Sequence, residues 1–104
     1  MKRALFVLTI LLCGSQGRAD PLTTPDGTDA FFGLGWAAAA DKICTLKTYR
    51  IVLVASKAAG LTDQEIADNA WKIAETAVQA AQEVQRTGRD KWCANYRRGF
   101  LTGR

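Results

Sequence analysis

The clearest periodic pattern of apolar positions lies between Thr62 and Gly88. Small and apolar residues recur there at alternating spacings of three and four, the period of one buried face on an α-helix. Thr62 and Glu65 have the spacing of a capping box, which predicts that a helix begins there, and Gly88 predicts its end. We therefore expect one long helix. Its apolar stripe would consist of Ile66, Ala70, Ile73, Ala77, Ala81 and Val84, widened by Ala67, Ala74 and Val78.

Shorter helices are expected before and after this one. The alanine-rich run 37–44 favours a helix, and a threonine within 45–48 is expected to cap a further helix that ends at Gly60. Residues 49–54 are rich in β-branched side chains and would also suit a strand, but a single strand would have no partner to pair with. We interpret this segment as helical.

A last helix is expected from Asp90 to about Phe100. In that helix Trp92, Cys93 and Tyr96 fall on the same side as Phe100, at nearly helical spacing.

The segment 20–29 differs in composition from everything that follows it. It holds both prolines of the chain, together with threonine, aspartate and glycine, and predicts a flexible arm with extended or turn structure. The next six residues alternate large apolar side chains with Gly33 and Gly35, which makes a helix start there unconvincing. We expect the apolar members to dock onto the core as a hydrophobic lid, with an exposed patch for a partner as the alternative. They are Phe31, Phe32, Leu34 and Trp36.

The first nineteen residues have the order of a secretory signal peptide. Lys2 and Arg3 precede a short apolar core of nine residues, 4–12, and Gly17 and Ala19 occupy the two positions that a signal peptidase inspects. The apolar run is far shorter than the roughly 20 residues of a membrane-spanning helix, so we expect cleavage after Ala19 and no transmembrane anchor in the mature chain. Lipidation at Cys13 is an alternative, although the residue before that cysteine is not small.

Cleavage at this site changes the cysteine count. It would leave Cys44 and Cys93 as the only sulfur pair, and exported proteins meet an oxidising compartment, so we expect a disulfide between them. An alanine-lined core in a mature chain of this size should be marginal, and closing this loop is worth about 4 kcal/mol in the loop-entropy model. The predicted fold is thus an all-α domain over residues 30–104, with three to four helices and one disulfide.

Cleavage also changes the charge. Loss of the basic residues Lys2, Arg3 and Arg18 leaves eleven basic against ten acidic residues, so the net charge of +4 nearly disappears. A nucleic-acid partner then lacks the positive field on which such binding depends. What remains is an acidic segment over 61–85 and a basic tail over 86–104.

The residue types available argue against catalysis. The chain has no histidine, which removes the commonest general base and the commonest metal ligand, and paired cysteines would leave no thiol nucleophile. Only Asp63, Glu65 and Asp68 form a dense acidic group, and an acidic first turn that complements the helix dipole explains them. We expect no enzymatic activity, no catalytic residue, no metal site and no cofactor.

The remaining candidate surface for a partner is basic and aromatic. We expect cations and rings on the last helix, and an aromatic side chain on the long helix, to contact an unidentified protein or an anionic component of the cell envelope. The alternative is a solvated basic face whose rings turn into the core. The candidate residues are Trp71, Trp92, Tyr96, Arg97, Arg98 and Phe100.

Three functions fit these observations. The first is a small exported protein, in the periplasm or secreted, that acts by protein contact or envelope-surface contact. The second is a stress chaperone, because the chain is similar in general design to small periplasmic acid-stress chaperones, although the residues around its cysteines match no family pattern. The third is a secreted factor that acts on a host, as in virulence. The sequence does not define an oligomeric state.

Overall fold

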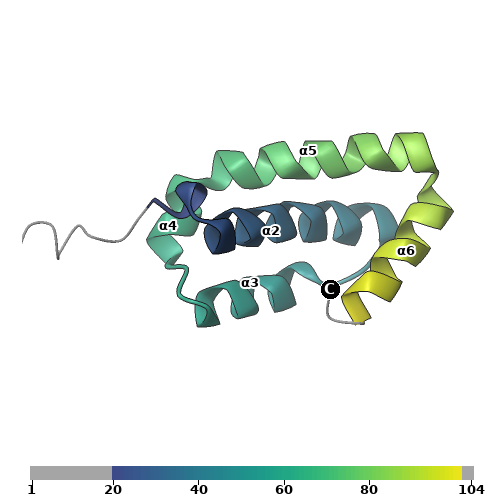
Figure 1. The fold of residues 1–104 in the computed structure, drawn as a ribbon. Helices are drawn as coiled ribbons and strands as arrows, with labels where there is room; N and C mark the ends of the chain where they lie inside the picture. The colour runs from purple at the N-terminus through teal and green to yellow at the C-terminus, as the bar shows by residue number, and fades with distance from the viewer. Residues whose placement is uncertain (1–19, 102–104) are drawn as a thin grey trace, which may run out of the picture.

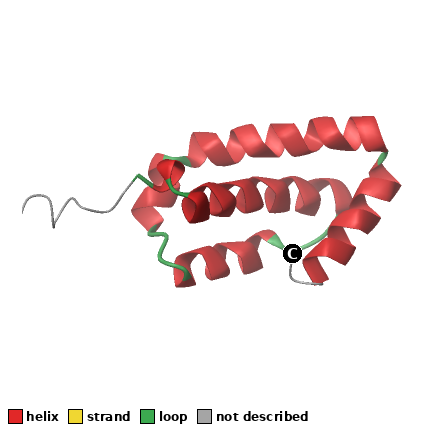
Figure 2. Ribbon diagram, viewed as in Figure 1, coloured by secondary structure: helices red, strands yellow, loops and turns green. Residues whose placement is uncertain are grey.

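The computed structural model describes residues 20–101, and within this range the chain is helical with short connections (Figure 2). Within these residues there are five α-helices and one short 3₁₀ turn, and no strand. This confirms the all-α class. The expected leader and Cys13 lie outside the described residues. In chain order the elements are the 3₁₀ turn η1 (Pro21–Thr23), α2 (Pro25–Cys44), α3 (Tyr49–Ala58), α4 (Asp63–Asp68), α5 (Ala70–Thr87) and α6 (Arg89–Leu101).

The long helix α2 is the centre of the molecule. Figure 1 shows α5 along one side of α2 and α3 along the other, while α6 crosses the end where α2 finishes. The chain turns from α5 into α6 at Gly88, whose backbone has a φ of 98°. Glycine adopts this left-handed conformation without a steric penalty. Because α5 and α6 meet at this sharp turn, the last helix is directed back across α2 and toward α3.

Helix α2 begins earlier than the sequence predicted. Thr24 accepts a hydrogen bond from the Gly27 amide at 3.1 Å, and Pro25 occupies the first turn, where its missing N–H is not needed. The expectation of extended or turn structure over 20–29 therefore holds only for the 3₁₀ turn before Pro25. Threonine before a proline is a strong helix start, and here it prevails over the turn-forming composition of the segment.

The glycines of α2 do not interrupt the helix, contrary to expectation. A Cβ atom on Gly35 would lie 1.7 Å from the Thr76 Oγ1 atom and 2.7 Å from the Ile73 carbonyl oxygen of α5. Position 35 therefore requires glycine because the two helices approach each other closely there. Thr76 uses this proximity to donate a hydrogen bond to the Phe31 carbonyl oxygen of α2 at 3.2 Å.

The expected long helix over 62–87 is divided into two. The capping box at its start is confirmed, since the Thr62 hydroxyl accepts from the Glu65 amide at 3.1 Å and Glu65 accepts from the Thr62 amide at 2.9 Å. At Asn69, however, the backbone leaves the helical region, and its side chain donates to the Glu65 carbonyl oxygen at 2.9 Å. Asparagine competes for backbone partners in this way, which explains the break. This break contributes to a total of five helices, where three to four were expected.

The apolar stripe of α5 is rotated from its expected position. The residues of α5 that are buried are Thr76, Ala80 and Val84, whereas Ala74 and Val78 of the expected stripe are exposed. The reason is the contact with Gly35, since the small side chains around Thr76 allow α5 to approach α2 most closely. A threonine is acceptable at this buried place because its hydroxyl has backbone acceptors.

The core has two parts, one toward each end of α2. In the first, Phe31 and Leu34 are fully buried and pack with Leu61, which confirms that these two lid residues dock onto the core. The second lies where α6 crosses. Its buried members are Ala39, Ala40, Ala80, Val84, Trp92 and Cys93.

Cys44 and Cys93 meet beside this second part of the core. Their Cα atoms are 5.7 Å apart, a separation that suits a disulfide, although the residues are 49 positions apart in sequence. The pair therefore lies between the last turn of α2 and the first half of α6. Within residues 20–101, no helix combines the length and the apolar character that crossing a membrane requires.

Candidate functional site: an aromatic groove

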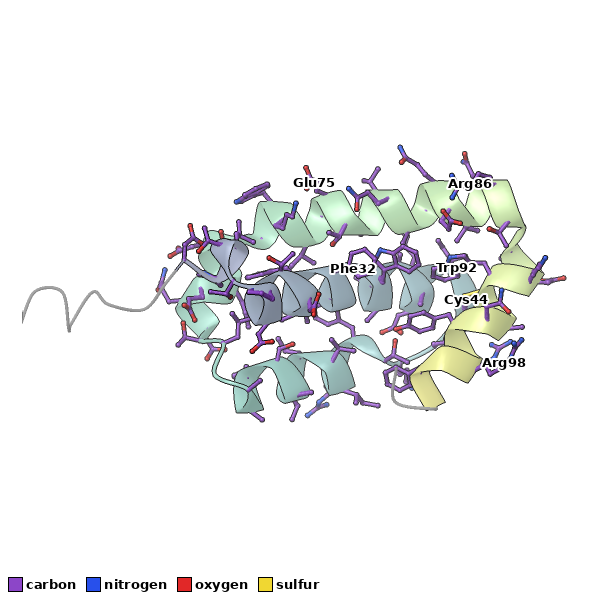
Figure 3. The ribbon with its side chains drawn as sticks, viewed as in Figure 1. Phe32, Cys44, Glu75, Arg86, Trp92 and Arg98 are labelled. Carbon is purple, nitrogen blue, oxygen red and sulfur yellow. A yellow bond between two sulfur atoms is a disulfide. The ribbon has the colours of Figure 1, made fainter. Side chains whose placement is uncertain are left out.

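Five aromatic rings form a continuous row across α2 and α6. Each ring centroid lies between 4.9 and 6.1 Å from the next, within the usual range for aromatic pairs. Figure 3 labels two members of the row, Phe32 and Trp92. In order along the row, the rings belong to Phe32, Trp36, Trp92, Tyr96 and Phe100.

Helix geometry explains why the row exists. Phe32 and Trp36 are four positions apart on α2, and the α6 rings also recur every four positions, so each set projects from one face of its helix. The first turn of α6, which follows Gly88, places the ring centroid of Trp92 5.5 Å from that of Trp36. The two sets then continue each other across the helix crossing.

A groove of about 490 Å³ lies along this row. This volume falls within the range of about 300 to 1,000 Å³ that is typical of sites for small ligands. Helix α2 contributes Phe32, Gly33 and Trp36, α6 contributes the rings of Tyr96 and Phe100, and Val52 belongs to α3. The remaining lining residues are Asp29, Asn95 and Gly99.

Trp92 belongs to the core and does not line the groove. Its side chain is only 5% exposed and lies between the rings of Trp36 and Tyr96. The sequence suggested that Trp92 contacts a partner directly. That expectation is wrong, because the side chain is buried in the core. Phe32, by contrast, is 45% exposed although the sequence analysis expected it in the lid. The phase of α2 places Phe31 inward and its neighbour outward, and Phe32 takes the place of Trp92 as an accessible ring.

Tyr96 is held in position by a polar network that joins three helices. Its hydroxyl is hydrogen-bonded to the Thr48 hydroxyl at 3.0 Å, and Thr48 in turn donates to the Asp41 carboxylate at 2.8 Å. The same carboxylate accepts the Thr48 amide at 2.7 Å and the Tyr49 amide at 2.8 Å. Asp41 of α2 therefore caps α3 from a distance, whereas the sequence predicted a threonine cap. Thr48 occupies the cap position but makes no side-chain capping bond itself.

The surroundings of Tyr96 raise the pKa of its hydroxyl above the usual value of tyrosine. The main cause is burial, which disfavours the phenolate, and the negative charge of Asp41 adds to it. The hydrogen bond with Thr48 acts in the opposite direction. Tyr96 is thus a neutral ring at physiological pH, half-buried, with its edge fixed by Thr48 and its position in the groove well defined.

Trp36 has the one buried side-chain polar atom without a hydrogen-bond partner in the described part of the chain. This atom is the indole nitrogen Nε1, which is removed from solvent. An unpaired buried donor is costly, and native proteins contain few of them. Trp36 also lines the groove.

The two candidate arginines of α6 do not line the groove. Arg98 donates to the Asn95 side chain at 3.1 Å and lies on the outer side of α6, away from α2 (Figure 3). Arg97 lines a separate hollow of about 260 Å³ beside the cysteine pair, together with Arg89 and Asp90. The structure therefore separates the rings from the cations that the sequence grouped into one surface.

Trp71 lies on the outer face of α5 and is 57% exposed, as the sequence suggested. Lys72 Nζ lies 5.8 Å from the centroid of its ring. Val78, two turns further along, is also 57% exposed. None of the described residues that line the groove belongs to α5.

The three acidic residues of α4, Asp63, Glu65 and Asp68, have structural roles. Asp63 forms an ion pair with Lys57 at 2.8 Å, Glu65 belongs to the capping box, and Asp68 accepts from Gln64 at 2.8 Å. Among residues 20–101, no group of histidine, cysteine, aspartate and glutamate side chains is arranged to hold a metal ion. Within the described range we therefore take the groove, with its volume of about 490 Å³ and its row of rings, as the candidate site.

No protein-family model, no curated protein and no solved structure matches this chain. The chemistry of the groove is thus the basis on which its function is inferred.

Proposed function

We propose that this is a small exported, non-enzymatic protein of the bacterial periplasm that acts by binding a segment of another protein in its aromatic groove. The observation that carries the proposal is the concentration of solvent-accessible rings around one hollow. Phe32, Tyr96 and Phe100 line the groove with Trp36, whereas soluble proteins normally bury most aromatic area. Aromatic side chains are the commonest anchors of protein interfaces.

Helix packing supports this role because it makes the groove a prepared surface. The ring row is continuous with the buried Trp92, and Tyr96 is fixed by the network through Thr48 to Asp41. Side chains that are already ordered lose little conformational entropy when a partner binds. The groove can therefore bind without a large rearrangement of the helices.

Export and a disulfide complete the proposal. We propose that residues 1–19 are a cleaved signal peptide and that Cys44 and Cys93 form a disulfide in the oxidising periplasm, with secretion to the outside as the alternative. Cell fractionation combined with thiol alkylation tests both points. The exported protein should resist alkylation until it is reduced and should have lost the leader's mass. Free thiols in a cytoplasmic fraction would contradict this part.

A capture experiment from the native cell envelope tests the binding role. The unaltered protein should enrich a specific protein, and a variant with Phe32→Ala and Phe100→Ala should not. Trp71→Ala is the matched control, because it removes an exposed ring from the outer face of α5. Equal enrichment by all three proteins, or loss only with Trp71→Ala, would refute a role for the groove.

A second candidate is an acid-stress chaperone, and the charge balance of the chain after the expected leader favours it. Residues 20–104 hold ten acidic and eleven basic residues, so neutralisation of the carboxylates in strong acid would leave the positive charges to repel one another and loosen the fold. Circular dichroism and client-aggregation assays at about pH 2 to 3 should then show loosening and a gain of chaperone activity. A tightly folded and inactive protein at that pH would exclude this candidate. The role of a secreted host-interaction factor remains a prediction from the leader alone.

A further inference from the structure

We propose that the aromatic groove recognises a basic side chain, lysine or arginine, presented by an apolar segment of the partner protein. This inference rests on the proposed function and adds the chemistry of the partner. Its basis is the juxtaposition of a carboxylate with the accessible rings. Among residues 20–101, Asp29 is the one charged residue that lines the groove.

The position of Asp29 follows from the α2 sequence. Asp29, Phe32 and Gly33 are related by steps of three and four positions, so they lie on one face of the helix and one turn apart. Asp29 is exposed and has no ion-pair or hydrogen-bond partner among residues 20–101. Other acidic residues of the described chain are used in this way, for example Asp63 with Lys57 and Glu75 with Lys72. The carboxylate in the groove is therefore available to a cation.

The rings favour the same kind of ligand. The face of an aromatic ring is negative, and a lysine or arginine side chain placed over it gains a cation–π interaction. The long methylene stem of such a side chain would also contact the apolar groove wall formed by Val52 and the rings. Cation, stem and rings are thus complementary along the length of the groove.

The nearby positive charges leave the groove available to a cation. Arg97 belongs to the hollow beside the cysteines, and Arg98 points to the outer side of α6 while it contacts Asn95 at the groove edge (Figure 3).

Raised salt should weaken the attraction between Asp29 and a basic side chain of the partner, since Asp29 is exposed and its charge is screened.

Nuclear magnetic resonance with short peptides tests this inference. The probes are a terminally blocked peptide of leucine, arginine and leucine, and the same peptide with glutamine in the centre. The indole N–H signal of Trp36 reports on the groove, and the signal of Trp71 on α5 serves as the internal control. The arginine peptide should shift the Trp36 signal and bind at least about fivefold more tightly than the glutamine peptide.

Two variants separate charge from ring chemistry. At low salt, Asp29→Asn should lower the ratio of the two affinities, arginine peptide over glutamine peptide, by about two- to fivefold. Asp90→Asn is the matched control: it makes the same change of charge at an exposed position of α6 and should leave this ratio unchanged. Phe32→Leu keeps an apolar side chain but removes a ring, and it should weaken the arginine peptide more than the glutamine peptide. Because Asp29 and Phe32 are exposed, unchanged circular dichroism is the expected check that both variants fold.

The outcomes distinguish this inference from the proposed function. If both peptides bind equally and Asp29→Asn changes neither affinity, the groove is an apolar docking site and the inference of a basic side chain is refuted. If neither peptide shifts the Trp36 signal, peptide binding by the groove is itself refuted. Preferential binding of the arginine peptide that survives Asp29→Asn and Phe32→Leu would also refute the inference, because the cation would then be recognised elsewhere.

Discussion

Substitution of Gly35 by alanine should destabilise the protein, although alanine is the better helix former. The added Cβ would lie 1.7 Å from Thr76 Oγ1 and 2.7 Å from the Ile73 carbonyl oxygen. The Ile73 oxygen belongs to the backbone, and Thr76 Cβ would also lie 2.7 Å away, so rotation of the Thr76 hydroxyl alone does not relieve the contact and α2 and α5 must move apart. That movement would also break the hydrogen bond from Thr76 to the Phe31 carbonyl oxygen and leave the hydroxyl with only the Ile73 carbonyl oxygen of its own helix, at 3.0 Å.

The magnitude follows from three contributions. Forced overpacking costs about 1 to 3 kcal/mol, and the lost hydrogen bond costs about 1 kcal/mol. Replacing glycine within a helix returns about 1 kcal/mol. The free energy of unfolding should therefore fall by about 2 kcal/mol.

Gly33→Ala is the matched control because it lies two positions away in the same helix. A Cβ atom there would lie 3.5 Å from Val52 Cγ1, an ordinary contact, so this variant should gain up to about 1 kcal/mol. Urea unfolding followed by circular dichroism at fixed pH measures both variants. The account of the α2–α5 contact is refuted if Gly35→Ala is as stable as Gly33→Ala, or more stable.

Three further predictions concern the contacts that join the helices. Asp41→Ala should lower the free energy of unfolding by about 2 kcal/mol in urea melts, because it leaves two α3 amides uncapped; an unchanged midpoint would contradict this capping role. Tyr96 should contribute stability below the usual tyrosine pKa of about 10 that is lost as the pH rises through its raised value. Tyr96→Phe should therefore flatten the alkaline part of the stability profile, and an unaltered profile would count against the burial of its hydroxyl. Reduction of the pair Cys44–Cys93 should lower stability by about 4 kcal/mol, measured as a shift of the thermal midpoint; equal midpoints for the oxidised and reduced forms would show that the pair does not constrain the chain.

Local signals in the sequence predicted the parts of the fold that depend on near neighbours. The capping box at Thr62 and Glu65 is a contact across three positions, and the structure contains it as predicted. The proximity of Cys44 and Cys93 was also foreseen, because removal of the expected leader would leave only these two cysteines. These inferences needed no knowledge of how the helices pack.

Contacts between distant residues explain what the sequence did not reveal. Gly35 is indistinguishable from a helix breaker until Thr76 is known to lie against it, 41 positions later in the chain. Asp41 caps the following helix from seven or eight positions away, across the turn that Thr45 makes with a φ of 58°. Neither relation leaves a local pattern.

The candidate site was only partly predictable for a related reason. Helical spacing correctly placed Trp92, Tyr96 and Phe100 on one face of α6, but spacing does not say which end of that face is buried. The crossing with α2 buries Trp92 and leaves the other two rings at the groove. Phe32 was overlooked as an accessible ring, and the signal that could have identified it is its spacing of four from Trp36, combined with inward-facing Phe31.

Site-specific photo-crosslinking in the living envelope tests the central claim most directly, namely that the aromatic groove is the surface that contacts a partner protein. A photoreactive phenylalanine analogue would replace Phe32 in the groove, or Trp71 on the outer face of α5 as the matched control. The account predicts a discrete crosslinked partner from position 32 and none from position 71. A partner captured only from position 71, or no specific partner from position 32, would contradict it.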